Sequence, residues 1–147
     1  MSDLTDHLGF WLRYVSNHVS QRFAERLAGT GVTVAEWVVL RQMYDSDVTA
    51  PSAIASATGL TRGAISKLIE RLREKDLVTR TESTGDRRFQ DVRLTRAGRK
   101  LVPQLAALAD QNDEEFFAVL APAERRQFRT ALEQLVAAHG LQRIPME

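Results

Sequence analysis

The feature that most constrains the fold is a set of small and apolar residues at fixed spacing in the middle of the chain. In a helix-turn-helix, a small residue lets two helices cross closely, a glycine makes the tight turn, and two later apolar residues lock the second helix. The residues at these positions are Ile54, Ala55, Gly59, Ile65 and Leu68. The spacing predicts a helix over residues 51–58, a turn at Gly59 and a second helix over residues 61–77. An unrelated helical hairpin is the alternative.

The second predicted helix separates apolar from basic residues. Thr61 is a suitable N-cap, because its hydroxyl can accept a hydrogen bond from a free backbone amide of the first turn. One face carries Ile65, Leu68, Ile69 and Leu72 at helical spacing. The other carries Arg62, Ser66, Lys67, Arg71, Arg73 and Lys75. A solvated amphipathic helix also has such a face, so its meaning depends on the neighbouring segments.

After Leu77 the periodicity changes to the alternation of β-strands. Residues 78–82 and 90–94 alternate and are separated by STGDRR, in which Gly85 and Asp86 are turn formers. A hairpin directly after a helix-turn-helix is a wing. Asp86 and Arg88 allow a weak surface ion pair as one interpretation. We favour a second, in which Asp86 braces the hairpin and an arginine at its tip enters a minor groove.

Positive charge is concentrated in this part of the chain. The whole chain of 147 residues has a net charge of +1, but residues 60–100 contain 12 Lys and Arg against 6 Asp and Glu. A local basic surface of this kind is typical of a protein that meets phosphates, whereas the low overall charge argues against a general polyanion binder.

Composition excludes several other classes of protein. With 44% hydrophobic and 27% charged residues, the chain is an ordinary globular protein. It has neither an apolar run near the roughly 20 residues that span a bilayer nor the features of a secretory signal, so we expect it in the cytoplasm. It has no cysteine, its histidines His7, His18 and His139 are scattered, and it lacks a glycine-rich phosphate loop. We therefore predict no enzyme, no cofactor and no metal site. Zinc regulation in particular is disfavoured, because His7 and His18 lie roughly 16 Å apart along a helix.

Helices are also predicted on both sides of this unit. The first is capped by Asp3 or Thr5, continues to about Ala28 and carries apolar residues on two faces. A helix over residues 34–44 follows a capping box of Thr33 and Glu36, and a short β-bridge is predicted around residues 48–49. Two further helices are expected over residues 96–120, with a kink at Pro103, and from Pro122 to Gly140.

Taken in order, these segments resemble the multiple antibiotic resistance regulator (MarR) family of winged-helix transcription factors. The resemblance covers nearly the whole chain, through VTVAEWVVLRQM, SAIASATGLTRGAISKLIERLREKDLVTR, GDRR and VRLTRAGRKL. It implies a mainly α fold with a small β-hairpin wing. Residues 33–95 would form a winged helix-turn-helix lobe. Residues 1–30 and 96–147 would form a helical dimerisation region within a single MarR-like chain. It further implies a homodimer that presents two such lobes to one DNA duplex.

The resemblance also implies which residues meet DNA. The major-groove face would comprise Thr61, Arg62, Gly63, Ser66 and Lys67. Arg88 would enter the minor groove with support from Asp86 and help from Arg87. Ser52 and Arg71 are phosphate candidates. This chain has Gly63 and Ala64 where polar residues often stand in the family, so we expect fewer direct base contacts.

A small-molecule effector, commonly an aromatic or phenolic anion between the dimer helices and the DNA-binding lobe, is the last implication. The candidates by position and chemistry are Trp11, Tyr14, His18, Trp37 and Arg41, although packing in the dimer core is an alternative for the aromatic residues. The predicted function is a repressor, or as an alternative an activator, that binds a pseudo-palindromic duplex and responds to a ligand. A winged-helix protein–protein interaction module without specific DNA binding is the rival, because the fold alone does not imply DNA binding.

Overall fold

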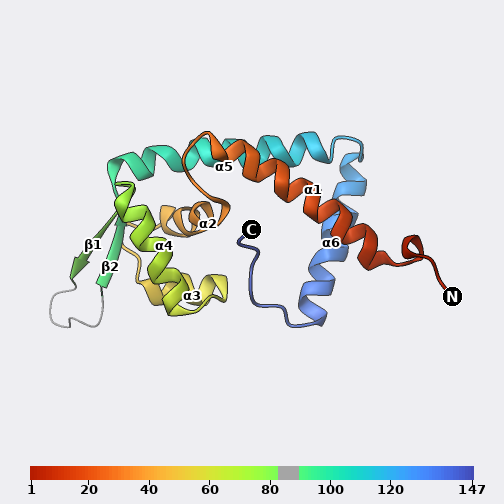
Figure 1. The fold of residues 1–147 in the computed structure, drawn as a ribbon, viewed down its shortest axis with the longest axis horizontal. Coiled ribbons are helices and arrows are strands. Elements are labelled where there is room, and N and C mark those ends of the chain that lie inside the picture. Colours follow the sequence, from red (N-terminus) through yellow and green to blue (C-terminus); the bar gives the residue numbers. More distant parts are fainter. Residues whose placement is uncertain (83–89) are drawn as a thin grey trace.

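The computed structural model describes residues 1–82 and 90–147 and has the predicted mainly helical fold with one antiparallel hairpin (Figure 1). A short 3-10 helix at Leu4–Asp6 precedes the first long helix. The helices are α1 (Leu8–Ala28), α2 (Val34–Tyr44), α3 (Pro51–Thr58), α4 (Arg62–Glu74), α5 (Arg96–Phe116) and α6 (Pro122–Ala138), and the strands are β1 (Val78–Glu82) and β2 (Gln90–Leu94).

Local signals in the sequence fix the helix-turn-helix. Gly59 follows α3 with φ +73°, in the left-handed region that glycine adopts without a steric penalty. The Thr61 hydroxyl then accepts a hydrogen bond of 3.1 Å from the amide of Ala64 and caps α4. The predicted helix pair and its turn are therefore confirmed.

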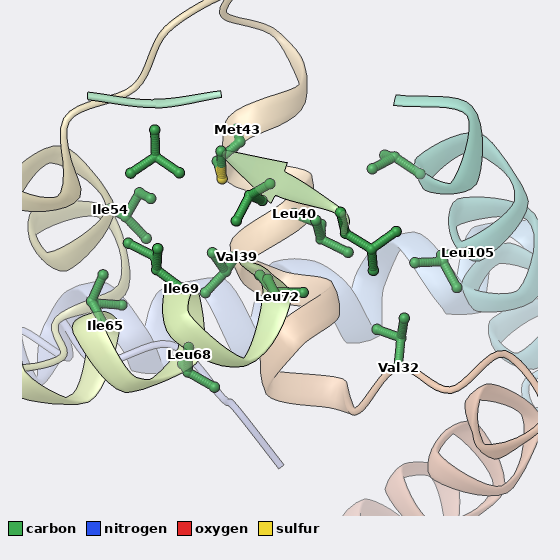
Figure 2. Packing of buried hydrophobic residues seen from close by; sticks show 14 of the residues in the cluster. Val32, Val39, Leu40, Met43, Ile54, Ile65, Leu68, Ile69, Leu72 and Leu105 are labelled. Carbon is green, nitrogen blue, oxygen red and sulfur yellow. The ribbon is translucent and has the colours of Figure 1, made fainter. Parts of the chain in front are cut away.

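The hydrophobic core joins this pair to α2 and α5. Figure 2 shows apolar side chains from the different helices pointing toward one another, among them Leu40, Ile54, Ile69, Leu72 and Leu105, each at most 1% exposed. Burial of this kind contributes about 25 cal/mol per Å² of apolar surface removed from water. The apolar face of α4 is thereby packed against the core, which holds the helix in place.

The hairpin is attached to the same core. Val78 pairs with Leu94 and Arg80 with Val92 in an antiparallel register, and the predicted bridge appears between Thr49 and Val92. At the start of α5, Thr95 caps the helix by accepting from the Gly98 amide at 3.0 Å. A Cβ atom at Gly98 would overlap the carbonyl oxygen of Leu77, so only glycine allows α5 to begin this close to β1.

The outer helices differ from the predictions at their ends. The first helix is not continuous from Asp3 or Thr5, because His7 has extended backbone angles and separates the 3-10 turn from α1. Helix α5 ends at Phe116 rather than near Leu120, since the chain turns there and the Leu120 amide donates to the carbonyl of Phe117.

Helices α1 and α5 pack against each other, whereas α6 buries no side chain in the described single chain. Pro103 lies inside α5, and the kink predicted there remains a prediction. None of the described helices combines the length and the hydropathy that a membrane span requires.

Candidate nucleic-acid interface

Helix α4 presents one face to the core and the other to solvent. Ile65, Ile69 and Leu72 are fully buried, and Leu68 is 8% exposed. The structure brings five predicted DNA-binding residues together at the N-terminal half of the solvent-exposed face: Thr61, Arg62, Gly63, Ser66 and Lys67. Arg71 is exposed one turn further along the helix. This arrangement leaves hydroxyl, guanidinium and ammonium groups accessible from one side.

The basic face of α4 is shorter than the sequence pattern suggests. Arg73 Nη2 donates to Glu70 Oε1 at 2.6 Å, and this hydrogen bond lowers the pKa of the Glu70 carboxyl. Lys75 turns toward α2 and pairs with Glu36 at 2.7 Å. Among the described residues, Arg62, Lys67 and Arg71 form no ion pair, so they are the charges of α4 available to an anion.

A contact that the sequence analysis missed joins the hairpin to α4. Arg80 Nη2 on β1 donates to Ser66 Oγ at 3.2 Å, and its Nη1 lies 3.9 Å from Glu70 Oε2. Strand alternation carries the signal for it, because Arg80 lies on the same strand face as buried Val78. With Arg80 donating to its oxygen, the Ser66 hydroxyl has its own hydrogen free for an acceptor outside the chain.

The other predicted contacts are divided between described and undescribed residues. Ser52 is exposed near the start of α3. Asp86, Arg87 and Arg88 lie outside the described residues.

The predicted ligand-binding residues lie at three places in the described chain. Tyr14 and His18 stack with ring centroids 5.2 Å apart and line one hollow, and Trp11 stacks on Tyr14 at 6.5 Å. Trp37 lines a different hollow of about 330 Å³ between α1, α2 and α5. Arg41 pairs with Asp45 at 2.9 Å. In the described part of a single chain, these five residues therefore do not share one hollow.

Asn112, one of the residues that line the hollow beside Trp37, has a buried polar atom without a partner in the described part of the chain. The Asn112 amide group donates to the carbonyl of Val19 at 3.2 Å, but its Oδ1 is buried without a partner in the described part of the chain. Sequence periodicity gave no indication of this residue, since a single polar residue on a helix is usually exposed. In the described ranges, no three His, Asp or Glu side chains gather as metal ligands.

Comparison with known proteins agrees with this geometry. Residues 30–88 match the model of the MarR family. A putative transcriptional regulatory protein for the hcr operon of Thauera aromatica is 29% identical, over 90% of this chain and 80% of the relative. The transcriptional repressor NicR of Pseudomonas putida is 25% identical, over 91% of this chain and 85% of NicR.

A solved structure gives the same result for the fold. Bordetella bronchiseptica BpsR, whose structure concerns regulation of DNA binding by 6-hydroxynicotinic acid, has a TM-score of 0.80 and 27% identity. The alignment covers 92% of this chain and 96% of BpsR. The helix-turn-helix, the hairpin placed after it and these comparisons together show a chain that is similar to the MarR family of winged-helix transcriptional regulators, whose members are not enzymes.

Proposed function

We propose that this regulator is a homodimeric, sequence-specific repressor in the cytoplasm that binds a pseudo-palindromic DNA duplex and releases it when a small ligand binds. The observation that carries the proposal is the exposed face of α4, on which Arg62, Ser66 and Lys67 stand opposite a fully buried stripe. A helix of this kind fits the major groove, where side chains can read base edges. The repressor NicR and the regulated DNA binding of BpsR support the same function.

The DNA-binding surface we propose combines three elements. Thr61, Arg62, Gly63, Ser66 and Lys67 read the major groove, and Ser52 and Arg71 hold phosphates. Arg88, supported by Asp86 and Arg87, reaches the minor groove. The free charges of Arg62, Lys67 and Arg71 supply sequence-independent affinity, while the hydroxyl of Ser66 and the shape of the DNA supply discrimination.

Enrichment of bound duplexes from a random library tests this function. The proposal predicts that the enriched sequences share a two-fold symmetric motif with half-sites about one helical turn, roughly 34 Å, apart. Recovery of no motif under conditions where the protein is folded would instead favour the protein-interaction module.

The dimer is supported by apolar side chains that a single chain leaves in solvent. Leu8, Trp11 and Leu12 of α1 are 88%, 50% and 46% exposed, and Leu135 and Val136 of α6 are 50% and 48% exposed. Large apolar side chains that are grouped along a helix and left in solvent often mark an interface. We assign residues 1–30 and 96–147 to dimerisation and residues 33–95 to DNA binding.

Sedimentation analysis of a matched pair of variants tests the dimer. Leu135→Asp places a charge in the proposed interface and should give folded monomers. Gln134→Asp places the same charge at the adjacent position, in a separate hollow of α6, and should leave the dimer intact. Equal dimer content in both variants would contradict the assignment.

The ligand is supported by the aromatic residues near α1 and α2. Trp37 lines a largely apolar hollow, and Trp11, Tyr14 and His18 form a stacked series on α1. In a dimer the α1 series of one protomer can complete the hollow of its partner, with Arg41 as the nearest cation by position on α2. An aromatic acid suits such a site, and an acid of this class, 6-hydroxynicotinic acid, regulates DNA binding by BpsR.

Isothermal titration with a panel of aromatic acids, including 6-hydroxynicotinic acid, tests this site. The proposal predicts that an acid of the panel binds the parent chain with measurable heat and releases its bound duplex. The heat of binding should be smaller for Trp37→Leu. Absence of binding across the panel would favour the alternative in which these aromatic residues only pack.

A further inference from the structure

The last residues of the described chain fold back onto the helix-turn-helix. Helix α6 ends in a turn in which Gly140 has φ +59° and the Leu141 amide donates to the carbonyl of Val136. This left-handed ending directs the chain away from the helix axis. Figure 1 shows the segment running from the far end of α6 back toward α2 and α3.

The contact is made at the turn between α3 and α4. The Ile144 amide donates to the carbonyl of Thr58 at 3.1 Å. Thr58 is the last residue of α3, where carbonyl groups lack partners within the helix. The segment therefore satisfies a backbone group of α3 that its own helix leaves unpaired, only a few residues before the N-cap of α4.

The fit at this turn is close at the level of the backbone. A Cβ atom added to Gly59 would lie 2.8 Å from Arg143 Cα and 2.9 Å from the Gln142 carbonyl oxygen. Glycine is thus required here for two separate reasons, its positive φ and the approach of the C-terminal segment. At Gly31, which has a similar φ of +76°, an added Cβ would meet nothing within 4 Å.

The same segment lines part of the hollow beside Trp37. Pro145 and Glu147 form part of the wall of this hollow, together with residues of α1, α2 and α5. Met146 is half-buried and packs against the hydrophobic core. One short stretch of chain therefore contacts both the hollow and the turn of the helix-turn-helix.

We propose that residues 141–147 are an intramolecular strap, docked on the Thr58–Gly59 turn and closing the hollow beside Trp37. The strap links the two places: a molecule that fills the hollow contacts Pro145 and Glu147, and these residues flank Ile144, whose amide donates to the carbonyl of Thr58. The inference does not depend on DNA binding, because it concerns only contacts within the chain.

A double-mutant cycle tests the docking at the turn. Gly59→Ala should lower the urea midpoint of unfolding more than Gly31→Ala, because both add strain from a positive φ but only Gly59→Ala displaces the strap. Ile144→Asp, which releases the strap, should remove this difference. An equal cost of the two glycine substitutions in the parent chain, or a difference that survives Ile144→Asp, would overturn the proposal.

Fluorescence quenching tests closure of the hollow. In a Trp11→Phe background Trp37 is the one remaining tryptophan of the sequence, so acrylamide reports its accessibility. Ile144→Asp should raise the quenching constant, whereas Gln142→Asp, which adds the same charge at an exposed strap position, should not. Equal quenching constants in the two variants would show that the strap does not cover Trp37.

Discussion

Lys75 and Glu36 join the last turn of α4 to the first turn of α2. Lys75 Nζ lies 2.7 Å from Glu36 Oε2 and also donates to the carbonyl of Gly31 at 2.7 Å. The Glu36 side chain is 1% exposed, whereas that of Lys75 is 39% exposed. These contacts therefore tie the end of α4 to the first turn of α2 and to Gly31, which lies three residues after the end of α1.

Removing the lysine leaves a buried carboxylate without its cation. We expect Lys75→Ala to lower the free energy of unfolding by about 1–3 kcal/mol, the usual cost of an unsatisfied buried polar group. Urea denaturation followed by circular dichroism measures the change. Lys100→Ala, at an exposed position on α5, is the control and should stay within about 0.5 kcal/mol of the parent.

The same pair predicts a pH dependence of stability. Burial raises the pKa of the Glu36 carboxyl, but hydrogen bonds from Lys75 and Thr33 and the Lys75 charge outweigh burial and hold the pKa below its ordinary value of 4.5. The folded state thus binds this proton less readily than the unfolded state. The stabilisation is present above about pH 4.5 and is lost as the pH falls through the lower folded value.

Thermal unfolding of the parent chain and of Glu36→Gln across this range measures the effect. The difference in unfolding temperature between the two proteins should shrink on acidification. A constant difference would show that Glu36 titrates alike in the folded and unfolded states.

Arg80 holds Ser66 on the exposed face of α4, so the two residues should act as a unit in DNA binding. Arg80→Ala is expected to weaken binding to the enriched duplex by about 1 kcal/mol, the net contribution of one hydrogen bond. In a Ser66→Ala background it should have little further effect. Fluorescence anisotropy of the parent chain, the two single variants and the double variant measures the coupling. Purely additive losses of binding free energy would show that the two residues act independently.

Arg88 lies outside the described residues, and its role is predicted from its place in the GDRR turn. We expect Arg88→Ala to weaken operator binding at least about tenfold, or roughly 1.4 kcal/mol, with the dimer intact. Sedimentation and anisotropy on the same sample separate the two effects. Affinity equal to that of the parent chain would disprove the assignment to the minor groove.

The elements that the sequence predicted correctly are those specified by nearby residues. The capping box of Thr33 and Glu36, the left-handed Gly59 and the N-cap Thr61 each act within one turn of the chain, and all appear in the structure. The exposed face of α4 follows from helical periodicity in the same way. Local chemistry thus accounts for most of the helix-turn-helix.

Contacts between distant segments could not be predicted in this way. Periodicity placed Lys75 on the basic face, but its partner Glu36 lies 39 residues away and turns it from that face. The contacts of Ile144 with Thr58 and of Arg80 with Ser66 likewise depend on how the helices pack. The end of α5 was misplaced because the residues after Phe116 are compatible with a helix, and the turn forms through the Phe117 carbonyl.

The salt dependence of binding to the enriched duplex, compared between Lys67→Ala and Arg126→Ala, tests the central claim most directly. Arg126 lies on α6, away from α4 (Figure 1). If the exposed face of α4 binds DNA, the logarithm of the affinity falls steeply with the logarithm of the salt concentration, and Lys67→Ala reduces that slope by about 1 per protomer while Arg126→Ala leaves it unchanged. A flat dependence, or equal slopes for the two variants, would contradict the claim.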